Sequence, residues 1–159
     1  MTLADRVKMH LPRARTDPAP KDSSGYHEGF RQSGTDKGKR VVEVLRRLGA
    51  DPVRCAYVSV GGSYGSEIEY VMEHSAIRKG VLLEYDDRVI DQVFALRTKM
   101  AAQGKQLELV IGDANQKKGS VRSHLSPWFD NREVDTVVCS AQAVFHELPT
   151  RSPGSGAPT

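Results

Sequence analysis

Residues 58–66 have the sequence Val-Ser-Val-Gly-Gly-Ser-Tyr-Gly-Ser, and this stretch decides the fold. An apolar run from Cys55 to Val60 ends abruptly at three glycines within five positions. A helical pattern follows, with Ser66 as its expected cap. The order strand, glycine-rich turn and helix lets the backbone approach a ligand closely at a helix N-terminus. Because tight strand-to-helix turns can also be purely structural, the loop alone leaves both interpretations open.

Apolar runs and helical periods alternate along the rest of the chain. Strands are predicted over residues 55–60, 81–85, 107–111 and 134–139, and helices over 36–48, 66–75 and 89–100. Thr35 is the expected cap of the first helix. Residues 115–133 show little periodicity and indicate a loop and a short helix. The alternation predicts a doubly wound parallel α/β sheet of about four strands.

Acidic residues follow two of these strands, at the edge of a parallel sheet where ligands bind. Glu84 ends the second strand, where a carboxylate can accept hydrogen bonds from both hydroxyls of a ribose. The alternative is an acid in a solvated loop. Asp113 ends the third strand and could accept from the exocyclic amine of adenine, or it could cap a turn.

Four motifs in this order resemble those of class I S-adenosylmethionine-dependent methyltransferases over residues 37–150. They are Val58–Gly65, Leu82–Asp86, Ile111–Ala114 and Asp135–Ser140. The resemblance implies a Rossmann-like doubly wound parallel sheet with helices on both faces. It also implies the strand order 3-2-1-4 and the cofactor S-adenosylmethionine.

The resemblance also implies a role for individual residues of the chain. Gly61, Gly62, Ser63 and Gly65 would line the methionine part of the cofactor, and Glu84 would hold the ribose. Tyr85 and Asp86 would flank the adenine, whose amino edge would meet Asp113 and Ala114. Ser140 ends the fourth strand at the same edge and is also a candidate cofactor-binding residue.

The sequence departs from the family pattern within the glycine loop. Ser59 occupies the position where the family commonly has an acid, which weakens a polar contact near the methionine amine. Ser63 replaces the middle glycine, which is tolerable if its backbone angle is ordinary. His146 lies in a segment that often carries a histidine in methyltransferases of small molecules. It could act as a general base, or be an ordinary packed or solvated side chain.

The chain resembles the cofactor-binding half of a methyltransferase. We expect a polar leader over residues 1–35, a cofactor-binding domain over 36–148 and a disordered tail over 149–159, without a fifth strand. The methyl acceptor is unknown, with a small molecule favoured, and the chain by itself could lack activity. The fourth strand would then be an edge through which the chain could self-associate.

Two other functions remain open. A nicotinamide-dependent oxidoreductase also has a glycine-rich loop followed by an acid, but Ser63 would occupy its second glycine position. The other alternative is a non-catalytic binding module.

Composition limits the class of protein further. No apolar run reaches the roughly 18 residues of a membrane helix, and no signal-peptide core is present, so a cytosolic protein is expected. The net charge of +3 is too small to support nucleic-acid binding. Cys55 and Cys139 are expected to be buried free thiols. No metal-ligand spacing is present, and no metal is expected.

Overall fold

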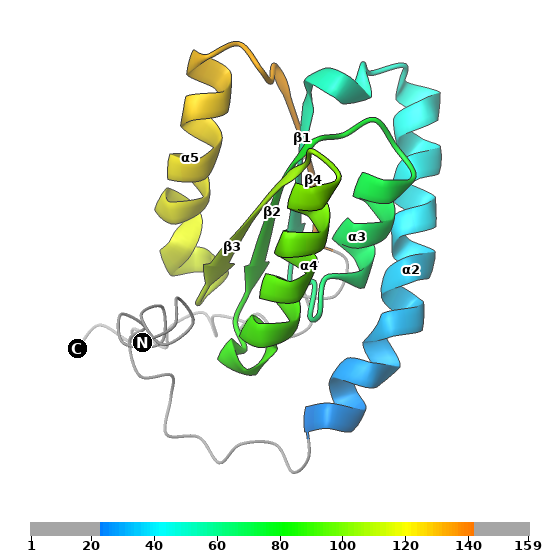
Figure 1. The fold of residues 1–159 in the computed structure, drawn as a ribbon, viewed down its shortest axis with the longest axis vertical. Coiled ribbons are helices and arrows are strands. Elements are labelled where there is room, and N and C mark those ends of the chain that lie inside the picture. Colours follow the sequence, from blue (N-terminus) through cyan, green and yellow to red (C-terminus); the bar gives the residue numbers. More distant parts are fainter. Residues whose placement is uncertain (1–22, 142–159) are drawn as a thin grey trace, which may run out of the picture.

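The computed structural model describes residues 23–141 of the chain. Helices and strands alternate along it (Figure 1). In chain order they are α2 (Ser23–Leu48), η1 (Pro52–Arg54), β1 (Cys55–Val60), α3 (Ser66–Glu73), β2 (Lys79–Glu84), η2 (Asp87–Val89), α4 (Ile90–Ala102), β3 (Gln106–Ile111), α5 (Ala114–Asp130) and β4 (Thr136–Ser140).

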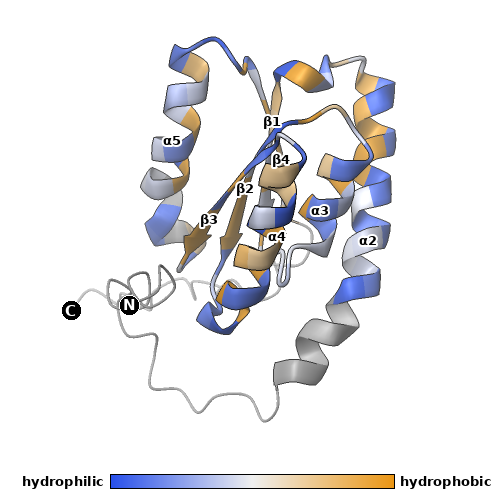
Figure 2. Ribbon diagram, in the orientation of Figure 1, coloured by the Kyte–Doolittle hydropathy of each residue, from blue (hydrophilic) through white to orange (hydrophobic). Residues whose placement is uncertain are grey.

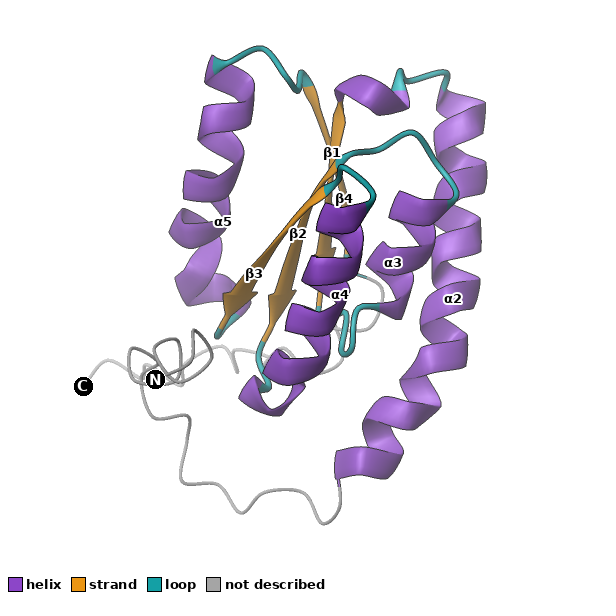
Figure 3. Cartoon of the chain, viewed as in Figure 1, coloured by secondary structure: helices purple, strands orange, loops and turns teal. Residues whose placement is uncertain are grey.

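The four strands form one parallel sheet in the order β3-β2-β1-β4 (Figure 3). Val58 of β1 lies opposite Val81 of β2 on one side and Cys139 of β4 on the other. Helices cover both faces, so the structure is an incomplete Rossmann-like fold. The predicted fold class and strand order are confirmed. β1 has its predicted bounds, while β2 and β3 begin one or two residues earlier than predicted.

Successive side chains along the strands point into two hydrophobic cores in turn, one on each face of the sheet. Helices α3 and α4 pack on one face, α5 packs on the other, and α2 packs on α3 (Figure 1). Cys55 and Tyr57 of β1 point into the core beneath α3 and α4, whereas Ala56 and Val58 point into the core beneath α5. Hydrophobic residues accordingly run along the strands (Figure 2).

Helix α2 is longer than the sequence predicts. It begins at Ser23, so the predicted start at Asp36 is wrong, and the first turns of α2 fall within the predicted leader. Thr35 is not a cap, because it lies inside the helix and its Oγ1 donates to the carbonyl of Arg31 at 3.2 Å.

Gly34 and Gly38 let α2 lie close to α3, although glycine in a sequence usually favours the end of a helix. A Cβ on Gly38 would come within 2.8 Å of the Tyr70 Cβ and 2.9 Å of the Glu67 carbonyl oxygen. Gly34, one turn earlier, would meet the side chain of Ser66. The glycines are therefore explained by contact with a neighbouring helix, which the periodicity of α2 alone does not reveal.

Helix α5 replaces the predicted loop and short helix of residues 115–133, and that prediction is wrong. It has 17 residues and contains Pro127. Val121, Leu125 and Trp128 lie at helical spacing and pack on the core of this face. The rest of the helix is largely hydrophilic (Figure 2), which is why its period is weak in the sequence.

Strand β4 lies at the edge of the sheet formed by the described residues and is largely exposed. It spans Thr136–Ser140 rather than residues 134–139, and Val134 is buried just before it. Cys55 is a buried free thiol as predicted, but Cys139 is exposed, so that prediction is wrong. The reason is that α5 packs on β2 and β3, which leaves Val137 37% exposed on this face.

Among residues 23–141, no helix is both long and apolar enough to cross a membrane. His146 and the predicted tail, residues 149–159, lie outside the described residues, as do residues 1–22.

Candidate functional site

The predicted site residues gather where the carboxyl ends of the strands meet. In Figure 1 this edge is at the lower end of the sheet, where the arrows of β2 and β3 point. The glycine loop of residues 61–65 follows β1, Glu84 ends β2, Asp113 follows β3 and Ser140 ends β4. The parallel topology therefore brings together residues that lie far apart in the sequence.

The glycine loop has a backbone that requires two of its glycines. Gly61 and Gly65 have φ values of +70° and +88°, in the left-handed region that favours glycine. The N–H of Gly61 donates to the carbonyl of Leu83 at 2.8 Å, which ties the loop to β2. Gly65 is the N-cap of α3 and gives no side-chain cap, so the predicted cap Ser66 is instead the first helical residue.

Position 62 requires glycine because of close packing, and not because of its backbone angle. A Cβ at this position would lie 2.5 Å from Leu82 Cδ1 and 2.6 Å from Ser59 Oγ. The loop thus presses directly on the ends of β1 and β2.

The backbone angle of Ser63 is not ordinary, so the condition for replacing the middle glycine without strain is not met. Its φ is +52°, so a residue with a Cβ occupies the left-handed region, which costs about 1–2 kcal/mol. In this conformation its N–H donates to Glu84 Oε2 at 2.6 Å.

Glu84 is a buried acid at the centre of this edge. Its residue is 8% exposed, which rules out the alternative of a solvated loop acid. Oε2 accepts from Ser63, and Oε1 accepts from the N–H groups of Tyr85 at 2.8 Å and Asp86 at 3.2 Å. The carboxylate is therefore oriented by backbone donors from two loops. The Glu84 carbonyl accepts from Gly112, which ties in the loop after β3.

Tyr85 and Asp86 follow Glu84 and differ in their surroundings. Tyr85 is 52% exposed and is available to contact a ligand. Asp86 caps η2, because its Oδ1 accepts from the N–H of Arg88 at 3.0 Å. Its carboxylate also pairs with the Arg88 guanidinium at 2.7 Å, and these hydrogen bonds raise the pKa of Arg88.

Asp113 and Ala114 form the start of α5. The backbone carbonyl of Asp113 accepts from the N–H groups of Gln116 and Lys117, at 3.0 and 2.8 Å. Ala114 packs against the core beneath α5. Asp113 therefore has a turn-forming role through its backbone, and its half-buried side chain lies at the predicted edge.

A buried polar cluster lies beneath the glycine loop and was missed by the sequence analysis. Glu67 in the first turn of α3 is 6% exposed, and its Oε1 accepts from the hydroxyls of Tyr57 and Ser59. Burial first, and the Glu67 carboxylate second, raise the pKa of Tyr57. Ser140 lies beside Ser59 in the β1–β4 register. An acid in a first helical turn commonly serves only the helix dipole, so this role of Glu67 has little signal in the local sequence.

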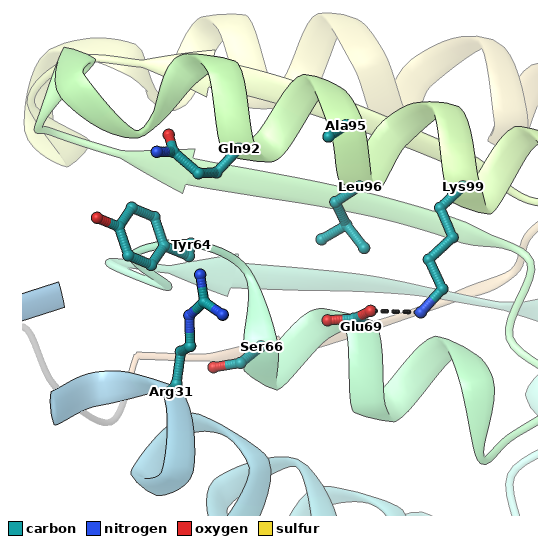
Figure 4. A pocket seen from close by; sticks show the side chains of 8 residues that line it. All are labelled: Arg31, Tyr64, Ser66, Glu69, Gln92, Ala95, Leu96 and Lys99. Atoms are coloured by element: carbon teal, nitrogen blue, oxygen red, sulfur yellow. Dashed lines mark hydrogen bonds and ion pairs between the residues drawn. The ribbon is translucent and has the colours of Figure 1, made fainter. Parts of the chain in front are cut away.

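A hollow of about 270 Å³ lies between α2, α3 and α4, on the outer side of the glycine loop. Arg31 lies over the ring of Tyr64 at 5.3 Å. Lys99 pairs with Glu69 at 2.6 Å (Figure 4). It also pairs with Glu73 at 2.7 Å, and these hydrogen bonds raise the pKa of Lys99. None of the predicted site residues lines this hollow.

Within the described part of the chain, no group of His, Cys, Asp and Glu side chains could hold a metal ion. No model of a protein family matches the chain, and no curated protein sequence matches it. The chain is therefore classified by its fold alone. It is a Rossmann-like sheet with a glycine loop and a buried acid at its carboxyl edge.

Proposed function

We propose that this edge binds S-adenosylmethionine and that the chain belongs functionally with the class I methyltransferases. The observation that carries the proposal is the buried Glu84 carboxylate, which the glycine loop orients through the Ser63 N–H at 2.6 Å. A carboxylate held at the end of β2, next to a loop whose backbone can be approached closely, suits the ribose of a nucleoside ligand.

Two further features support a nucleoside ligand with a polar tail. The tight packing around Gly62 and the left-handed angle of Gly61 favour glycine at both positions, so the start of the loop presents backbone rather than side chains. Tyr85 and Asp86 lie beside the expected adenine position, and Asp113 lies at the end of the next strand.

S-adenosylmethionine, when bound, would supply an activated methyl group. The chain's contribution would be to hold the nucleoside through Glu84 and to align the donor with an acceptor. We propose a small molecule as the methyl acceptor and do not specify it further. The cytosolic location expected from the sequence also stays a prediction.

Calorimetric titration with S-adenosylhomocysteine and, separately, with NAD tests the proposal. We expect binding of S-adenosylhomocysteine alone. Binding of NAD alone would favour an oxidoreductase, which the shared fold and acid also permit. Binding of neither by the folded chain would contradict both and favour a non-catalytic module.

Turnover is a separate question from cofactor binding. Labelled-methyl transfer from S-adenosylmethionine to a small molecule by the purified chain would extend the proposal from cofactor binding to catalysis.

A further inference from the structure

The buried cluster of Glu67, Tyr57, Ser59 and Ser140 contains an acid with no cationic partner. Both hydrogen bonds to the Glu67 carboxylate fall on Oε1, and within residues 23–141 no Lys, Arg or His pairs with it. Buried charges in proteins are normally paired. A carboxylate that has only two neutral hydroxyl donors is therefore suited to a cation that arrives with a ligand.

Ser140 supplies a second, independent observation. It is 6% exposed, and its Oγ is the one buried side-chain polar atom of the described residues that has no hydrogen-bond partner. Its hydroxyl lies close to the Tyr57 phenol. A buried hydroxyl without a partner is unusual in a native structure.

The Glu67 carboxylate and the Ser140 hydroxyl lie on the same face of the sheet. Ser59 and Ser140 are register partners in β1 and β4, and partners in parallel strands project to the same face. Ser59 donates to Glu67 at 3.3 Å, so Ser140 lies on the α3 side of the sheet as Glu67 does. The cluster lies directly below Gly62, whose Cα carries no side chain over Ser59.

We infer that Glu67 and Ser140 bind a primary ammonium group of the ligand, with Ser59 orienting the Glu67 carboxylate. This inference rests on the proposed function and identifies the group as the amino group of the methionine part of the cofactor. An ammonium has three donors, which matches a carboxylate oxygen and a hydroxyl oxygen that both lack a donor here. The acid is thus supplied by α3, whereas position 59 of β1 has only a serine.

The test compares two ligands, one with and one without the amino-acid part that carries this ammonium group. S-adenosylhomocysteine carries the ammonium, and 5′-methylthioadenosine has the same nucleoside and a thioether but no ammonium. Titration calorimetry measures both with the full chain and with Glu67→Gln, which keeps the shape and removes the charge. Glu69→Gln is the matched control, because Glu69 lies in the same helix and pairs with Lys99 instead.

We expect Glu67→Gln to weaken S-adenosylhomocysteine at least tenfold and to leave 5′-methylthioadenosine unchanged within twofold. Glu69→Gln should change neither. An equal loss of affinity for both ligands would show that Glu67 has only a structural role, and this would overturn the inference. So would unchanged affinity for both.

Ser140→Ala covers the case in which Glu67→Gln does not fold, because it removes only a hydroxyl that has no partner. We expect a threefold to tenfold loss for S-adenosylhomocysteine and none for 5′-methylthioadenosine. Unchanged affinity for both would overturn the inference. If the unaltered chain binds both ligands and every variant binds them equally well, the proposed function is supported and the ammonium site is contradicted. If the unaltered chain binds neither ligand, the proposed function and the ammonium site are both contradicted.

Discussion

The backbone N–H of Ser63 donates to the Glu84 carboxylate at 2.6 Å, and this bond joins the loop after β1 to the end of β2. It forms because Ser63 adopts a φ of +52° that places its N–H toward β2. One acid therefore both organises the loop and presents a charge at the ligand edge. Structural and binding roles of Glu84 must be separated by experiment.

Glu84→Ala should weaken binding of S-adenosylhomocysteine by roughly 1.5–3 kcal/mol, the range for hydrogen bonds to a charged group. Titration calorimetry measures the change, and circular dichroism shows whether the variant is folded. Glu43→Ala, which removes an exposed acid that pairs only with Arg47, is the control and should bind normally. Unchanged affinity in a folded Glu84→Ala variant would remove Glu84 from the site.

Gly61→Val should abolish cofactor binding and leave helix content largely intact. Gly104 offers a matched control, because both glycines have a φ of +70° and Gly104 has open space around it. Valine at either position costs the same kind of backbone strain, about 1–2 kcal/mol. Only the change at Gly61 should affect calorimetric binding. Equal binding by both variants would make the loop a purely structural turn.

Gly38→Ala and Gly119→Ala should change stability in opposite directions. A Cβ on Gly38 would crowd Tyr70 and the Glu67 carbonyl within 2.9 Å, and overpacking of this kind costs about 1–3 kcal/mol. Gly119 lies in α5 with nothing within 4 Å, so alanine there should add about 0.5–1 kcal/mol. Urea unfolding measures both. A stable Gly38→Ala variant would show that α2 does not need its close approach to α3.

Asp135→Asn should lower stability at neutral pH but not in acid. The hydrogen bond from Arg54, at 2.6 Å, holds the pKa of Asp135 below its usual value of 3.8. A depressed pKa means that the carboxylate stabilises the fold above 3.8, and that this gain is lost as pH falls through the folded-state pKa.

Urea unfolding at a series of pH values checks this prediction. The stability gap between the unaltered chain and Asp135→Asn should close in acid. The gap should also be much smaller in an Arg54→Met background, since the partner is then absent. A gap that persists unchanged in that background would assign it to another contact of Asp135, such as the one with Thr136.

Strand β4 should mediate self-association of the chain. Val137 is 37% exposed, Cys139 is exposed, and β4 is the edge of the sheet over the described residues. Sedimentation velocity should show dimers or larger species that Val137→Lys reduces, because a charge on an edge strand opposes pairing. Val44→Lys, at an exposed position of α2, should not reduce them. A monomer at all concentrations would contradict the prediction.

The sheet was predictable because its strands are short apolar runs, three of which end at a glycine or an acid. Cys55–Val60 and Glu84 were identified from local sequence alone. Helix α5 was missed because only Val121, Leu125 and Trp128 form its buried stripe. The first half of α2 was missed because Gly34 and Gly38 have a tertiary cause, the closeness of α3.

The polar cluster was hidden for a different reason. Glu67 and Ser140 are ordinary residues in their own segments, and only the pairing of β1 with β4 places them together. Similarly, the left-handed angle of Ser63 accompanies a hydrogen bond to an acid in another strand. Sequence pattern predicts elements, but these contacts depend on how the elements meet.

The interior place of β1 also determines when the sheet can be completed during synthesis. Its partner β2 follows within the next turn and helix, but Arg54 and Asp135, which join the starts of β1 and β4, are 81 residues apart. At ribosomal speeds of roughly 5–20 residues per second, β4 emerges on the order of ten seconds after β1. Until then one side of β1 has unsatisfied backbone groups, and a nascent chain in this interval is the form most exposed to chaperones and to misassembly.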